Sequence, residues 1–175
     1  VTTLEGYLYT DSYQVIKPAR DKVVIQDMLN NFAKRVAAAN VMEGITKQGL
    51  TLHQALTLAS IVEKEVSKPE DRAMVAQVYL NRLKAGMPLQ ADPTVIYAAE
   101  TTGQRFDVKL QSPYNTYVVK GLPPAPINNP SLSSLQAVSR PTPNDYIYFI
   151  ADKQGVTRYA KTFEEHQKNI EKYLK

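Results

Sequence analysis

The chain contains no cysteine among its 175 residues. It can therefore form no disulfide framework, no cysteine zinc cluster and no thiolate nucleophile. Its two histidines, His53 and His166, lie far apart and match no metal-ligand spacing, so we expect both to be solvated helix residues. Neither a GxGxxG pattern nor a P-loop pattern occurs. From these absences we expect neither a metal ion nor an organic cofactor.

Two further absences concern charge runs and membrane segments. The net charge is +4 and the pI is near 9.1, but the basic residues are scattered among acids and form no basic arm. Nucleic acid is therefore not an expected partner, although a mild positive field favours an anionic polymer or surface. The sequence has no run of 18 apolar residues and no signal peptide. Because the chain begins at Val1 without an initiator Met, we interpret it as an excised part of a longer protein.

Helical patterns dominate the first half of the chain. Apolar residues recur at helical spacing from about residue 23 to residue 39, and Asp21 is the candidate N-cap. A second helix is predicted to begin after Thr51, because Gln54 follows at the spacing of a capping box. This second helix contains the segment Leu58-Ala-Ser-Ile-Val-Glu-Lys-Glu65.

Further turns and caps divide the middle of the chain. The segment Ser67-Lys-Pro-Glu70 has capping-box spacing with proline in the first turn, and Gly86 is expected to end that helix. Asp92 before Pro93 is expected to cap a short helix. Residues 101–130 are predicted to be irregular, since prolines exclude both helix and central strand there. A short helix is expected over residues 133–139.

The period changes at the C-terminal end of the chain. Residues 145–150 and 156–160 have strand patterns separated by a turn over residues 152–155. Thr162 is then placed to cap a final helix. The expected class is α+β, mainly helical, with a small antiparallel β-sheet or hairpin near the C-terminus. We expect residues 1–175 to form a single domain.

Glu63 lies within the apolar arc of the second helix. Winding the segment at about 100° per residue places it between Leu52 and Leu56, whereas Lys64 points away. Burial disfavours the charged form of a carboxyl group, so the pKa of Glu63 should rise, as a general acid requires. The alternative is a buried structural acid paired with an arginine or with backbone donors. Glu65 lies at the other edge of the arc.

Polar and aromatic residues in the following loops suit a carbohydrate groove. Sugar rings stack on aromatic side chains, and their hydroxyls pair with amides and carboxylates. The candidate substrate-binding residues are Gln90, Asp92, Thr94, Tyr97, Tyr114, Asn115, Thr116, Tyr117 and Asn128. The alternative is that these side chains hold their own loops together, as asparagine and aspartate often do in turns.

Several segments in order resemble one known family over nearly the whole chain. They are Leu4-Glu-Gly-Tyr-Leu, Leu58-Ala-Ser-Ile-Val-Glu-Lys-Glu65, Asn81-Arg-Leu, Leu89-Gln-Ala-Asp-Pro-Thr-Val-Ile-Tyr97, Tyr114-Asn-Thr-Tyr117 and Gly121-Leu-Pro-Pro124. The sequence resembles the membrane-anchored endolytic murein transglycosylases, the MltG or YceG-like family. The sequence departs from the family's motifs at Thr10 and Ala91, and neither departure changes the position of the proposed catalytic acid.

The resemblance implies a lysozyme-like helical core and a lytic reaction on peptidoglycan glycan strands. Such enzymes break the β-1,4 bond between N-acetylmuramic acid and N-acetylglucosamine without water and leave 1,6-anhydromuramyl ends. The catalytic glutamate of the family's motif maps onto Glu63, which would act first as general acid and then as general base. The resemblance also implies that residues 1–175 are one catalytic domain of a longer protein, without its N-terminal membrane helix and small preceding domain.

The implied setting is the extracytoplasmic face of the bacterial cell membrane, with peptidoglycan synthases (penicillin-binding proteins) as possible partners. Two other functions stay open on the residues alone. One is a glycan-binding or scaffolding module in which Glu63 is structural. The other is a two-carboxylate muramidase, for which Asp92, Glu5 or Glu65 could serve as the second acid.

Overall fold

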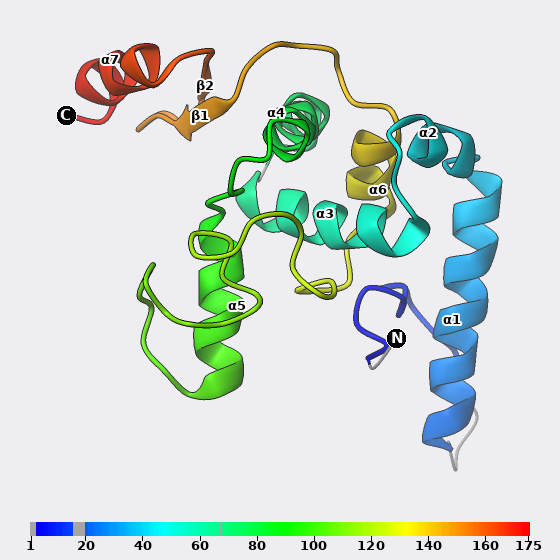
Figure 1. Cartoon of the computed structure of the whole chain (residues 1–175). Coiled ribbons are helices and arrows are strands. Elements are labelled where there is room, and N and C mark those ends of the chain that lie inside the picture. The colour runs from blue at the N-terminus through cyan, green and yellow to red at the C-terminus, as the bar shows by residue number, and fades with distance from the viewer. Residues whose placement is uncertain (1–2, 16–19, 67) are drawn as a thin grey trace.

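The computed structural model describes residues 3–15, 20–66 and 68–175, which form a mainly helical structure with one small hairpin (Figure 1). In chain order the elements are α1 (Asp21–Ala38), α2 (Met42–Lys47), α3 (Leu52–Glu65), a 3-10 turn η1 (Pro69–Asp71), α4 (Arg72–Lys84), α5 (Asp92–Thr102), α6 (Leu132–Ser139), β1 (Tyr148–Ala151), β2 (Thr157–Ala160) and α7 (Phe163–Tyr173). This arrangement confirms the α+β class.

Helix α3 is the central element of the core (Figure 1). It packs against α4, α5 and α6 and also meets α2. Its start is the predicted capping box: Thr51 Oγ accepts from the Gln54 backbone N–H at 3.2 Å, and the Thr51 N–H donates to Gln54 Oε1 at 2.8 Å. Every residue from Ala55 to Val62 is buried. Both faces of α3 are covered here, and polar side chains of its first and middle turns, such as His53 and Ser60, bond to neighbouring loops.

Some predicted helix starts differ from the observed ones. Asp21 and Asp92 were expected to cap α1 and α5, but each is the first residue of its helix, after Arg20 and Ala91, and the caps form no side-chain hydrogen bond. Carboxylates in a first helical turn still interact favourably with the helix dipole. The predicted cap Ser67 lies outside the described residues, and the chain enters α4 through η1 instead.

The sequence patterns did not predict α2. Its six residues include Gly44 and show no clear helical period. A Cβ on Gly44 would lie 2.2 Å from the Ser139 carbonyl oxygen, so glycine permits the close approach of α2 to the end of α6. This helix therefore depends on a contact with a distant segment rather than on local propensity.

The predicted hairpin and final helix are confirmed. Strands β1 and β2 pair antiparallel, with Phe149 opposite Tyr159, and each is slightly shorter than predicted. Asp152 organises the turn by accepting from two backbone N–H groups and by pairing with Arg158 at 2.8 Å. Thr162 caps α7 in a second capping box. The hairpin packs on α4 through β1 and on α7, so it forms one wall beside the end of α3.

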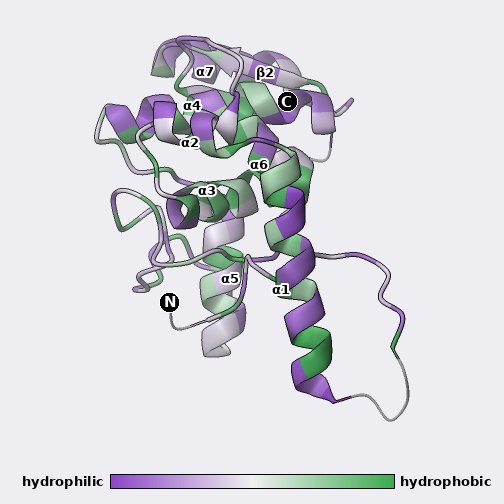
Figure 2. Cartoon of the chain, turned by 90° about the vertical axis from the view of Figure 1, so that its right-hand side faces the viewer, coloured by the Kyte–Doolittle hydropathy of each residue, from purple (hydrophilic) through white to green (hydrophobic). Residues whose placement is uncertain are grey.

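The distribution of hydrophobic and hydrophilic residues along the chain agrees with this packing (Figure 2). Helix α1 contacts the body through its C-terminal part, where Val36 is buried, and its N-terminal part extends away with Val23 exposed (Figure 2). Within the described ranges, no helix combines the length and the apolar character needed to cross a bilayer.

Candidate functional site

The last turn of α3 holds two glutamates that face different surroundings. Glu63 and Glu65 are two residues apart, so their side chains point in directions about 200° apart around the helix axis. Glu63 faces the start of α6, and Glu65 faces a cavity bordered by α4, α5 and the C-terminal hairpin. The two carboxyl groups must therefore be considered separately.

Glu63 is held by a dense set of donors. Its Oε2 accepts hydrogen bonds from the Ser131 backbone N–H at 3.1 Å, from Ser131 Oγ at 2.6 Å and from Ser134 Oγ at 2.6 Å. Its Oε1 pairs with the Arg72 guanidinium at 3.2 Å. Since Ser131 is the N-cap of α6, this carboxylate also lies at a helix N-terminus, where negative charge is favourable. These contacts fasten α3 to α4 and α6.

The expected rise in the pKa of Glu63 is wrong. Burial by itself raises the pKa, but the hydrogen bonds from Ser131 and Ser134 and the positive charge of Arg72 outweigh it and lower the pKa overall. The apolar arc indicated burial correctly but did not reveal the donors. These contacts favour the ionised form of Glu63.

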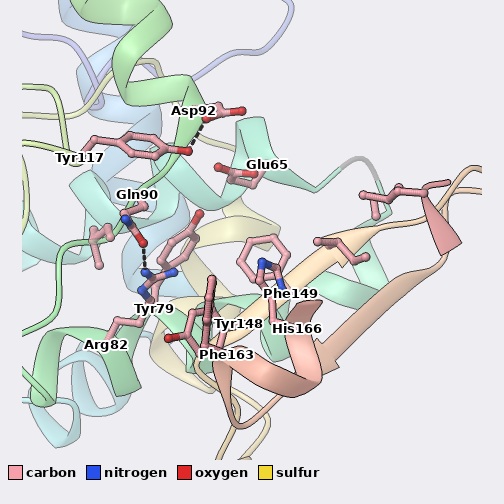
Figure 3. A pocket seen from close by; sticks show the side chains of 14 residues that line it. Glu65, Tyr79, Arg82, Gln90, Asp92, Tyr117, Tyr148, Phe149, Phe163 and His166 are labelled. Carbon is pink, nitrogen blue, oxygen red and sulfur yellow. Dashed lines mark hydrogen bonds between the residues drawn. The ribbon is translucent and has the colours of Figure 1, made fainter. Parts of the chain in front are cut away.

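The other carboxyl, Glu65, lines a cavity of about 430 Å³ (Figure 3). Polar side chains from α3, α4, α5 and the nearby loops line one part of it, and aromatic side chains from β1 and α7 line another. The residues labelled in Figure 3 are Glu65, Tyr79, Arg82, Gln90, Asp92, Tyr117, Tyr148, Phe149, Phe163 and His166. The cavity thus combines titratable groups with apolar rings, as a carbohydrate site would require.

Glu65 has the raised pKa that was expected of Glu63. Burial is the main cause and raises its pKa to about 7, with a further rise from the negative charge of Asp92. The Tyr79 side chain and the Asp92 backbone N–H interact with the carboxylate and offset part of this effect. A carboxyl group with a pKa near 7 is partly protonated at neutral pH and can serve as a general acid.

Three predicted substrate-binding residues line the same cavity: Gln90, Asp92 and Tyr117. The Tyr117 hydroxyl donates to Asp92 Oδ1 at 2.6 Å, and Gln90 Oε1 accepts from the Arg82 guanidinium (Figure 3). Asp92 thus orients a loop tyrosine instead of capping α5. These contacts place α4, α5 and the loop after α5 around one opening.

Three other predicted substrate-binding residues, Thr94, Asn115 and Thr116, are completely buried beside the cavity. Thr94 Oγ1 and Thr116 Oγ1 are 2.8 Å apart, and Thr116 Oγ1 accepts from the Ala91 N–H. The Asn115 amide donates to the carbonyls of Val108 and Leu110 at 3.0 and 2.8 Å. Their observed contacts hold the loop before α5 against the loop after it, and thereby position Gln90 and Tyr117.

The remaining three predicted substrate-binding residues, Tyr97, Tyr114 and Asn128, do not line the cavity. The Tyr97 hydroxyl donates to Glu5 Oε2 at 2.6 Å, and its ring packs on Tyr114 with centroids 4.8 Å apart. The Asn128 amide donates to the Ser60 carbonyl at 2.7 Å, which ties the proline-rich loop to α3. Of the nine predicted substrate-binding residues, three therefore line the cavity, and six stabilise the segments around it.

The sequence patterns did not identify the aromatic wall of the cavity. Tyr148 and Phe163 come from the hairpin and α7, which were predicted only as structural elements. His166, expected to be solvated, is partly buried and stacks on Tyr148 with ring centroids 5.0 Å apart. His53 is likewise not free in solvent, because it bonds to the Tyr7 hydroxyl at 2.8 Å and to the Pro124 carbonyl oxygen at 2.9 Å.

Comparisons with known proteins agree with this arrangement. Residues 1–172 match the YceG-like family. The chain is 39% identical over 176 residues to a Bacillus subtilis (strain 168) protein named endolytic murein transglycosylase, and 35% identical over 180 residues to one of the same name from Streptococcus pneumoniae (strain D39). A crystal structure of a yceG-like protein from Listeria monocytogenes superposes with a TM-score of 0.84 at 40% identity and covers 94% of this chain.

The chain belongs to the YceG-like family. Both curated relatives match 98% of it, but it spans only 48% of the Bacillus protein and 32% of the Streptococcus protein. It covers 55% of the Listeria chain.

Proposed function

We propose that this chain is the catalytic domain of an endolytic lytic transglycosylase that cleaves peptidoglycan strands, with Glu65 as its acid and base. The observation behind this proposal is a single carboxyl group with a pKa of about 7 in a cavity that also presents aromatic rings. The resemblance in sequence suggested Glu63 for this role. The contacts of Glu63 with Arg72, Ser131 and Ser134 instead favour a structural role for it.

In this mechanism protonated Glu65 donates its proton to the glycosidic oxygen between N-acetylmuramic acid and N-acetylglucosamine as that bond breaks. The resulting carboxylate then accepts the proton of the muramyl C6 hydroxyl, while the C6 oxygen bonds to C1. The products are a strand with a 1,6-anhydromuramyl end and a strand with a free N-acetylglucosamine C4 hydroxyl. Glu65 ends in its original protonated state, so one carboxyl group serves both steps.

The cavity supports these steps through two features. The negative charge of Asp92 and the burial of Glu65 both favour the protonated form that the first step needs. The rings of Tyr148 and Phe163 offer apolar faces on which sugar rings could stack. The Tyr117 hydroxyl donates a hydrogen bond to one oxygen of Asp92, Oδ1.

The longer protein, on this proposal, acts on peptidoglycan outside the cytoplasm, tethered to the membrane by a segment other than the described residues. Work beside the peptidoglycan synthases, the penicillin-binding proteins, is part of the same proposal. Its support is the name endolytic murein transglycosylase given to the relatives.

Mass spectrometry of purified glycan strands incubated with the chain in ¹⁸O-labelled water tests the reaction. We expect new anhydromuramyl ends that contain no label. Labelled reducing ends would instead indicate a hydrolase that activates water, and Asp92, in the same cavity, would then be the candidate second carboxylate. Strand binding without any product would indicate a glycan-binding module.

A further inference from the structure

Within the described residues, Arg82 is a buried arginine without an acidic partner. It lies on α4, is 6% exposed and lines the cavity. Arg35, Arg72 and Arg158 each pair with a carboxylate. Among the ion pairs of the described ranges, none includes Arg82. A buried charge is normally paired, because removing it from water without compensation is unfavourable.

The contacts that Arg82 does make leave part of its guanidinium unused. One terminal nitrogen donates to Gln90 Oε1, the Nε has no partner within the described part of the chain, and the guanidinium carbon lies 5.5 Å from the centre of the Tyr148 ring. The titratable groups near it are Tyr79, Tyr117, Tyr148 and His166. None of these is a carboxylate. Burial lowers the pKa of Arg82, in keeping with an uncompensated charge.

Gln90 adds a second donor at the same place. Arginine can only donate, so the amide oxygen of Gln90 must face it, and the amide nitrogen is left to donate elsewhere. Gln90 is exposed, and its backbone has a φ of 53°, in the left-handed region that residues other than glycine rarely adopt. Such backbone conformations are concentrated at ligand sites. The guanidinium and the amide NH₂ together suit a planar carboxylate.

We propose that Arg82 and Gln90 bind a carboxylate of the substrate strand, and so make recognition of muramyl residues depend on charge. The inference rests on the proposed function, because it is the glycan strand that supplies the carboxylate. Two sources share this chemistry. One is the lactyl group of N-acetylmuramic acid when no peptide is attached, and the other is a carboxylate of the stem peptide.

Binding measured by calorimetry with short muramyl oligomers tests this inference. Three ligands are compared: one with free lactyl carboxylates, one with the same groups as neutral carboxamides, and one with stem peptides. The Glu65→Gln chain is used so that binding can be observed without cleavage. A preference of at least about tenfold for the free acid over the carboxamide identifies the lactyl carboxylate, since a charge-assisted pair contributes at least that much. A similar preference for the peptide-bearing ligand alone identifies the stem peptide.

Three variants test whether the binding preference for a carboxylate depends on Arg82. Arg82→Met removes the charge and should abolish the preference, and Arg82→Lys keeps the charge without the planar fork and should retain only part of it. Lys84→Met is the matched control, because it removes one positive charge from an exposed position on the same helix, and it should leave the preference unchanged. Thermal unfolding checks the fold. Arg82→Met should unfold at the same or a higher temperature, because it removes an unpaired buried charge.

Equal binding of all three ligands to the Glu65→Gln chain that keeps Arg82, or no binding at all, would overturn the inference. A preference that survives Arg82→Met would also overturn it. These results are independent of the reaction. A chain that binds carboxylates through Arg82 but never cleaves strands would disprove the proposed function and leave the inference standing.

Discussion

The last turn of α3 places two glutamates, Glu63 and Glu65, in different surroundings on its two sides. On one side, Glu63 accepts hydrogen bonds from Ser131 and Ser134 and pairs with Arg72, and its pKa is lowered. On the other side, Glu65 is partly buried near Asp92, and this burial raises its pKa to about 7. The same residue type on the same helix turn therefore has opposite protonation preferences. The difference shows that donors supplied by distant segments decide which carboxyl keeps a proton.

The largest expected effect is on activity. Glu65→Gln should lower strand cleavage by at least about 100-fold, the usual contribution of general acid–base catalysis, because an amide cannot donate the proton. Quantification of anhydromuramyl ends over time measures this rate. Glu63→Gln is the matched control, and its folded fraction should keep most of the activity. Comparable losses in both variants would remove the functional difference between the two glutamates.

The next effect is on stability. Glu63→Gln should lower the free energy of unfolding by roughly 2–4 kcal/mol, because it leaves Arg72 without a counter-charge in a nearly buried position. Urea denaturation followed by circular dichroism measures the loss. Glu65→Gln should not destabilise the fold in the same experiment at neutral pH, since it replaces a group that is hard to ionise there. A stable Glu63→Gln chain would contradict the structural role given to this residue.

The pH dependence of stability should separate the two groups. Because the folded pKa of Glu65 is about 7 and the ordinary value is 4.5, the unfolded chain loses this proton first as the pH rises. The Glu65 contribution therefore lowers stability between pH 4.5 and 7, with a slope of up to about 1.4 kcal/mol per pH unit. The pKa of Glu63 is lowered, so this residue contributes stability above the ordinary glutamate pKa of 4.5. That contribution is lost as the pH falls from 4.5 through the lower pKa of the folded chain.

Urea denaturation of the parent chain and of Glu65→Gln at several pH values measures this difference. The stability of the variant relative to the parent should increase from pH 4.5 to pH 7 and stay constant above it. Cleavage by the parent should decline above about pH 7, where Glu65 loses its proton. A stability difference that does not change with pH would mean that the pKa of Glu65 is ordinary.

The smallest effect concerns one donor of Glu63. Ser134→Ala removes a hydrogen bond of 2.6 Å to its Oε2 and should lower stability by about 1 kcal/mol. The pKa of Glu63 should rise at the same time, because the ionised form loses a donor. Thermal unfolding and an NMR titration measure the two changes. An unchanged pKa would show that Ser134 does not help to keep Glu63 ionised.

Local patterns predicted most of the fold. The Thr51 and Thr162 caps, the helical core and the C-terminal hairpin depend on residues close together in sequence, and they are observed. Helix α2 was missed because its position depends on the contact of Gly44 with the end of α6. The starts of α1 and α5 were displaced by one residue, within the usual uncertainty of helix ends.

The site was less predictable. Burial of the Glu63 region followed from the helical period, but Ser131 lies 68 residues further along the chain, and no local pattern links the two. Arg82 and the aromatic residues of the hairpin join the cavity only through tertiary packing. The position of Glu65 at the other edge of the arc, next to Leu58 and Ile61, was the one sequence signal that it could also be buried.

The most direct test is an NMR titration of the glutamate side-chain carboxyl groups in the ¹³C-labelled chain. The Glu63→Gln and Glu65→Gln chains assign the two resonances. We predict that Glu65 titrates near pH 7 and that Glu63 titrates below the ordinary glutamate value of 4.5. A titration near pH 7 for Glu63, with Glu65 already ionised at low pH, would contradict the assignment of Glu65 as the acid.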